Sequence, residues 1–176
     1  LLPEVPMKRR LFDPRVGIFA NGYTVFDEDN QRATPELFTV RWRLEAKNAA
    51  DAAAQQRGEL IEPKKPIVYY IDPATPEKWV SFLKQGVEDW QPAFEQAGWK
   101  NAIQAKDWPV NDTTMSLNDS RYSVIRYFAS SVQNAYGPNV HDPRSGEILE
   151  SHIGWYHNIQ QLLKNWYTIQ TAMVDT

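Results

Sequence analysis

Alternation of apolar and polar residues marks a half-buried strand early in the chain. The stretch "FTVRWRLE" (residues 38–45) alternates over its whole length, and its apolar side chains share one face: Phe38, Val40, Trp42 and Leu44. A period of two residues is that of a β-strand. Upstream, Asn21-Gly22 stands between two apolar runs, which predicts the turn of a β-hairpin. An Ala-rich segment ended by Gly58 predicts a short surface helix.

A helical period replaces the alternation after residue 66. "IVYYI" (67–71) is a short apolar run of the kind found in a buried strand. Thr75 and Pro76 then predict a helix start, with Thr75 at the N-cap, and Gly98 predicts its end. Between them, apolar residues recur at helical spacing: Trp79, Phe82, Leu83, Val87, Trp90 and Phe94. We expect Trp79, Leu83, Val87, Trp90 and Phe94 to form the buried face of one long helix.

The remaining pattern predicts further strands and a last helix. Strands are expected at 102–108 and 122–129, followed by a loop at 138–146 and a helix from about residue 158 to 173. The order strand, long helix, strand, strand predicts an α+β fold with a mixed sheet and a helix packed on it. The linker "EPKKP" (62–66) divides a β-rich extension, residues 1–65, from a second region, residues 66–176.

Composition narrows the class of protein. With 176 residues and 42% apolar residues, the chain is long enough to bury a core. Its net charge of −3 has no basic run, which argues against a nucleic-acid partner. No apolar run reaches membrane-spanning length, and no signal peptide opens the chain. There is no cysteine, so disulfides and thiolate sites are excluded, which fits an exported protein. Because the sequence starts at Leu1 without a Met, we also expect it to be a piece of a longer protein.

The histidines are the first candidates for a metal site. His152 and His157 are five residues apart, which places them on opposite faces of a strand or about 140° apart on a helix. A zinc-binding helix needs histidines four residues apart on one face. The spacing therefore predicts that these two do not bind a metal together. His141 precedes Asp142-Pro143, a common turn pair, and a ligand role for it stays open.

Two other features allow more than one interpretation. Glu150 and His152 share a strand face, which fits either a structural polar pair or an oriented catalytic histidine. The tryptophans fit a sugar-binding platform, but those at helical spacing are more simply core residues. From the residues alone we predict no catalytic residue and no metal ligand.

Two long stretches carry a resemblance to a known family. The first, residues 58–103, contains "EPKKPIVYYIDPATPEKWVSFLKQGVEDW", and the second, residues 137–172, contains "HDPRSGEILESHIGWYHNIQ". Both resemble the large bacterial zinc-dependent metalloproteases of the DUF5117/DUF4953 type, which are metzincin-like and often exported. "LPEVPMKRRLFDPRVGIF" (2–19) and "RWRLE" (41–45) are similar to the segment that precedes the catalytic region of that family.

The resemblance implies a fold and a site. It implies the upper half of a metzincin-like domain: a mixed, mostly parallel twisted sheet with an antiparallel edge strand and two main helices. "SVQNAYG" (131–137) takes the place of the edge strand, which binds extended peptide substrate. The implied substrate-binding residues are Asn134, Ala135, Tyr136 and Gly137, and Gly137-Pro138 is expected to end the strand.

The family's zinc motif, His-Glu-x-x-His-x-x-Gly-x-x-His, is not in this sequence. Zinc is therefore expected in the intact family member and not on this chain, which alone is expected to be inactive. The expected partners are a peptide or protein substrate along the edge strand and the remainder of the protease domain. The alternative is a non-catalytic binding or assembly module that keeps the sheet.

Overall fold

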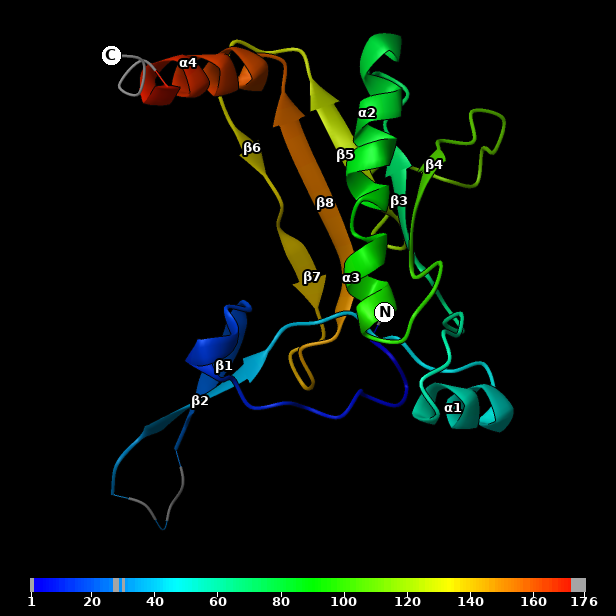
Figure 1. Cartoon of the computed structure of the whole chain (residues 1–176). Helices are drawn as coiled ribbons and strands as arrows, with labels where there is room; N and C mark the ends of the chain where they lie inside the picture. Colours follow the sequence, from blue (N-terminus) through cyan, green and yellow to red (C-terminus); the bar gives the residue numbers. More distant parts are fainter. Residues whose placement is uncertain (1, 27–28, 30, 172–176) are drawn as a thin grey trace.

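The computed structural model describes residues 2–26, 29 and 31–171, and it has an α+β architecture with two sheets (Figure 1). The larger, six-stranded sheet has the order β4-β3-β5-β8-β6, and β7 also pairs with β8. Its strands are β3 (Ile67–Ile71), β4 (Ile103–Asp107), β5 (Ser123–Phe128), β6 (Ala135–Tyr136), β7 (Asn139–His141) and β8 (Ile148–Tyr156). Neighbours among β4, β3, β5 and β8 are parallel, whereas β6 and β7 are antiparallel to β8. The predicted fold class, with its antiparallel edge strand, is confirmed.

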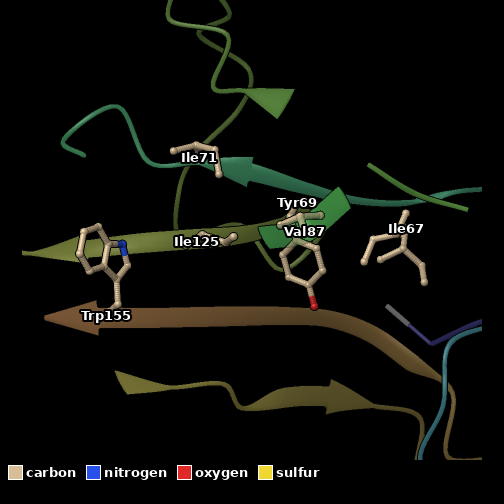
Figure 2. Packing of buried hydrophobic residues seen from close by; sticks show 7 residues of the cluster. Ile67, Tyr69, Ile71, Val87, Ile125 and Trp155 are labelled. Carbon is tan, nitrogen blue, oxygen red and sulfur yellow. The ribbon is translucent and has the colours of Figure 1, made fainter. Parts of the chain in front are cut away.

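The core lies between this sheet and two helices, α2 (Glu77–Glu88) and α3 (Gln91–Gln96). Burial alternates along β3, where Ile67, Tyr69 and Ile71 are buried. Because alternate side chains of a strand share a face, these three point the same way. Figure 2 shows them packed with Val87, Ile125 and Trp155. The apolar run "IVYYI" thus becomes one wall of the core, as expected.

The other face of the sheet is covered by the segment 108–122. Leu117 lies against this face, where its carbonyl accepts hydrogen bonds from Arg126 on β5 (Nη1, 3.3 Å) and meets His152 Nε2 on β8 (3.0 Å). Val124 is fully buried there. This face is therefore covered in part, at Val124 and its neighbours, whereas Val68 and Tyr70 of β3 are half-buried there.

The expected long helix is two helices. Asp89 ends α2, and α3 begins with Pro92 in its first turn, since proline is tolerated there but not in a helix interior. The prediction that Trp90 is buried is wrong: this residue, which lies at the break, is 61% exposed, and Phe82 is 64% exposed. Val87 is buried, and Trp79, Leu83 and Phe94 pack against the core as predicted. The N-cap is Pro76, not Thr75.

The N-terminal part forms a separate two-stranded sheet of β1 (Ala20–Val25) and β2 (Thr34–Thr39), preceded by a 3-10 turn, Pro14–Val16. The predicted turn at Asn21-Gly22 is wrong, because both residues lie inside β1. A side chain at Gly22 would collide with the backbone of Glu36 on β2. Gly22 is therefore needed for close strand approach, not for a turn.

The predicted strand at 38–45 is only partly formed. Phe38 and Thr39 end β2, and beyond it Arg41 makes a single bridge to Glu147. Phe38 and Val40 are buried, and Trp42 and Leu44 pack against the core, so the predicted apolar face exists. The Ala-rich helix is α1 (Ala49–Gln56), capped by Asn48.

The chain ends in α4 (Ile159–Thr171), in agreement with the expected helix, although residues 172–173 of that prediction lie outside the described residues. None of its side chains is buried. Among the described residues, no helix has the length and apolar character needed to cross a membrane. The division of the chain at residues 65 and 66 stays a prediction, and an ion pair between Arg43 and Glu147 (2.6 Å) crosses it.

Candidate functional site

β6 and β7 follow one another along the outer side of β8 and form one edge of the sheet (Figure 1). Ala135 and Tyr136 pair with Trp155 and Gly154, and after a gap of two residues Asn139 pairs with Ser151. The expected edge strand thus lies where predicted, but only its last third is strand. The edge continues into β7, so Gly137-Pro138 interrupts it and does not end it as expected.

The direction of each backbone group follows from one hydrogen bond. Tyr156 N–H donates to Asn134 C=O (3.2 Å), so the backbone N–H and C=O groups of Asn134 face β8. In an antiparallel pair, residues alternate between facing the partner and facing away. With this register, Tyr136 faces β8, whereas Ala135, Gly137 and Asn139 turn their backbone groups outward. Of the four predicted site residues, only Ala135 and Gly137 therefore present main-chain groups to another strand.

One of these outward donors is already used. Ala135 N–H donates to the side-chain oxygen of Asn134 (2.8 Å). Gly137 N–H and Ala135 C=O have no hydrogen-bond partner within residues 2–26, 29 and 31–171. Asn134 therefore covers part of the edge, while its neighbours leave one donor and one acceptor open.

Pro138 interrupts the pairing with β8 but does not affect the outward-facing backbone groups of Gly137 and Asn139. It occupies a position that faces β8, where its carbonyl accepts from the Ser151 hydroxyl (3.0 Å). Proline has no N–H, so this position breaks the ladder to β8. The break separates β6 from β7, but the outward donors on either side remain.

The side chain of Tyr136 fixes the edge against β8. Its ring lies over Gly154, its paired residue, at a place where any Cβ at 154 would collide with the ring. It also stacks with Phe128 and lies near Tyr156, each at 6.3 Å between ring centroids. An aromatic ring covering a cross-strand glycine restores packing that the glycine lacks. Tyr136 thus contributes to register, and its role is not that of a main-chain donor to substrate.

A tight turn holds the other end of the edge. Asp142, fully buried, accepts from Arg144 N–H (2.8 Å) and from the Arg144 guanidinium (2.7 Å to Nη2). The Arg144 side-chain hydrogen bond lowers the pKa of Asp142 below its ordinary value, although burial opposes this. Gly146 follows with a positive φ of 74°, which glycine adopts at little cost. This turn sets where β8 begins.

The three histidines have separate surroundings. His152 Nδ1 contacts a carboxyl oxygen of Glu150, and burial raises the pKa of that carboxyl, an effect that His152 opposes. His157 Nδ1 meets Tyr127 Oη at 2.8 Å, and His141 Nδ1 meets Asn139 Oδ1 at 3.0 Å. Glu150 and His152 share a face as predicted, and the Leu117 carbonyl at Nε2 makes the pair part of the packing of the segment 108–122.

These surroundings do not fit a zinc ion. Among the described residues, no three His, Asp or Glu side chains converge as a metal site would require. Both ring nitrogens of His141 and of His152 are in contact with polar groups, and Nδ1 of His157 meets Tyr127. We therefore derive no step through zinc from the residues of this chain.

Sequence reasoning missed the roles of Asn134 and Gly154. The side-chain cap at Ala135 and the ring over Gly154 depend on pairing with β8. A glycine within a strand pattern indicates that another group packs closely against the backbone there. Gly154 is such a glycine in the sequence.

Comparison with known protein families gives a match in the N-terminal part of the chain. Residues 1–47 match the family described as a domain of unknown function, DUF5117. The DUF5117 match covers β1 and β2 and ends before α1, so the edge formed by β6 and β7 lies outside it. No curated protein and no solved structure matches this chain.

Proposed function

We propose that the β6–β7 edge binds an extended peptide by main-chain pairing, and that the chain is the sheet part of a zinc-dependent metallopeptidase. The observation that carries the proposal is the row Ala135, Gly137 and Asn139, whose backbone groups face away from β8. An exposed row of this kind is a template for one more strand. Its members are exposed or half-buried, so a peptide has access.

The peptidase part of the proposal rests on the family resemblance. The match at residues 1–47 supports the DUF5117 part of that resemblance, and the antiparallel edge strand next to β8 agrees with the fold that the resemblance implied. Zinc, its ligands and the general base would belong to sequence outside these residues. Export of the protein is part of the same proposal and is compatible with the absence of cysteine.

Two substitutions with opposite effects test main-chain pairing. Ala135→Pro removes an outward N–H and should weaken binding of a blocked peptide of alternating Thr and Val by about tenfold, since an unmet hydrogen bond costs on the order of 1–2 kcal/mol. Asn134→Ala frees the same N–H from its side-chain acceptor and should leave binding unchanged or up to about fivefold tighter. Fluorescence anisotropy of a labelled peptide measures both.

Val132→Pro is the matched control, because residue 132 is exposed and precedes the strand. It should bind the peptide like the unmodified protein. Equal loss in Val132→Pro and Ala135→Pro, or tighter binding by Ala135→Pro, would contradict the proposed site.

The alternative is an assembly module in which the same edge pairs with a second copy of the chain. The exposed apolar side chains of α4 favour it, namely Leu163, Trp166, Tyr167 and Ile169. Sedimentation velocity separates the two functions. A dimer that Ala135→Pro dissociates supports assembly, whereas a monomer that binds peptide supports the proposed function. Zinc analysis of the full-length gene product tests the peptidase part.

A further inference from the structure

A cavity lies at the starting ends of the parallel strands, and Val140 of β7 is part of its wall, whereas Ala135 and Gly137 are not. It has a volume of about 950 Å³ and is bounded by the segments that precede β3, β5 and β8, together with residues 42–45. Figure 1 shows the segment after β2 passing the starting ends of these strands. A volume of this size accommodates a small organic ligand.

Some charged side chains in the cavity wall form ion pairs, and others do not. The two wall carboxylates, Glu147 and Glu45, are both bound by Arg43, at 2.6 and 3.3 Å. Arg121 is held by Asp119 (2.5 Å). Lys64 and Lys65 also line the cavity and are exposed, and neither ammonium group has an ion-pair partner among the described residues. The wall therefore includes two consecutive lysines whose charges have no ion-pair partner among the described residues.

The rest of the wall is mainly apolar and aromatic, with two serines, Ser120 and Ser123. Tyr70 and Tyr122 meet edge to face at 5.9 Å between ring centroids, and Trp42 and Val68 also line the cavity. Val68 and Tyr70 alternate with the core residues of β3, so they point to the opposite face of the sheet. An apolar wall with a few convergent charges is the usual character of a small-ligand site.

We propose that this cavity binds a small amphipathic anion, with its carboxylate or phosphate near Lys64 and Lys65 and its apolar body against Tyr70 and Tyr122. Both anionic groups accept hydrogen bonds from lysine, so the structure assigns the shared chemistry. The site is separate from the outward row at Ala135 and Gly137, so it does not depend on the proposed peptide binding.

Isothermal titration calorimetry with decanoate and with decyl phosphate tests the proposal, and decyltrimethylammonium serves as the matched cation. We expect saturable binding of at least one anion and none of the cation. The double variant Lys64→Gln/Lys65→Gln should raise the Kd for the anion about fivefold or more, with a smaller change at high salt. The stronger of the two anions identifies the headgroup.

Two further variants separate the site from general effects. Lys100→Gln/Lys164→Gln removes two exposed lysines that do not line the cavity, and it should leave the Kd unchanged. Val140→Trp fills the cavity from its exposed side and should weaken binding while both lysines remain. Circular dichroism checks that each variant is folded. Absence of saturable anion binding, equal binding of the cation, or equal weakening in Lys100→Gln/Lys164→Gln would overturn the proposal.

Discussion

The two outer edges of the main sheet differ in how their strands are protected. At one edge, β4 carries Lys106 and Asp107, and Asp107 forms an ion pair with Lys84 of α2 (2.7 Å). The side chain of Gln91 in α3 also donates to the carbonyl of Ile103. Charged side chains and covering helices are common means of preventing an edge strand from pairing with another chain.

The β6–β7 edge has few of these features. Residues 134–140 include no Lys, Arg, Asp or Glu, and no side chain of a described helix donates to their backbone. Only the Asn134 side chain and Pro138 limit pairing there. Within one sheet, one edge carries charged side chains beside two helices and the other lacks both features, which is why the uncharged edge is the candidate site.

The largest effect on the free energy of unfolding is expected from a substitution in β5, which lies between the two edges. Ile125 on β5 is 5% exposed and pairs with Ile71 of β3 and Ile153 of β8. Ile125→Ala should lower the free energy of unfolding by about 2–5 kcal/mol, because it leaves a cavity in the core. Urea denaturation measures this. Ile169→Ala, at an exposed position of α4, should change it by less than about 0.5 kcal/mol. A loss below about 1 kcal/mol for Ile125→Ala would show that β5 does not hold the edges together.

A second change loosens only the β6–β7 edge. Gly154→Val places a side chain where the Tyr136 ring lies, so the ring must swing out. We expect a loss of about 1–2 kcal/mol in the free energy of unfolding, from the lost aromatic packing. Amide exchange should become faster at Tyr136 and stay the same in β4. Faster exchange in β4 as well would mean that the change acts on the whole sheet.

Stability is expected to depend on pH through Asp142, in the turn between β7 and β8. The lowered pKa of Asp142 means that its contribution to stability is present above the ordinary aspartate pKa of about 3.9 and is lost as the pH falls through the lower folded-state value. The raised pKa of Glu150 acts in the opposite direction. Asp142→Asn should therefore flatten the fall in thermal midpoint below about pH 4 relative to the unmodified protein. Identical slopes in the two proteins would contradict this role of Asp142.

The smallest effect is expected at the β4 edge. Gln91→Ala removes the donor to the Ile103 carbonyl and should cost about 0.5–1.5 kcal/mol in urea denaturation. Peptide binding at β6 and β7 should not change. A change in that binding would indicate that the two edges are coupled.

The pattern of apolar residues predicted the fold class and the strands β3, β4 and β5, whereas β7 lies in a segment predicted as a loop. The run 67–71 and the segments 102–108 and 122–129 became β3, β4 and β5. Burial on both faces explains the apolar runs of the central strands β3 and β5 but not of β4, which lies at an edge. Periodicity could not predict the break at Asp89, because Pro92 is compatible with the first turn of a new helix. Trp90 was therefore assigned to the wrong environment.

The candidate site was less accessible to sequence reasoning. Asn21-Gly22 has the composition of a turn, but Gly22 is used for close approach to β2, and composition does not separate these two uses. The resemblance indicated which segment forms the edge. Which of its residues face outward depends on register with β8, and one hydrogen bond between Tyr156 and Asn134 fixes it.

Hydrogen exchange at single amides tests the β6–β7 edge most directly. The exchange of Gly137, Asn139 and the β4 amides is measured by NMR with and without the blocked Thr–Val peptide. If the edge binds an extended peptide, exchange at Gly137 and Asn139 slows when peptide is added, because their outward N–H groups gain acceptors, and exchange in β4 stays constant. Unchanged exchange at Gly137, or slowing in β4 alone, would contradict the assignment of β6 and β7 as the peptide-binding edge.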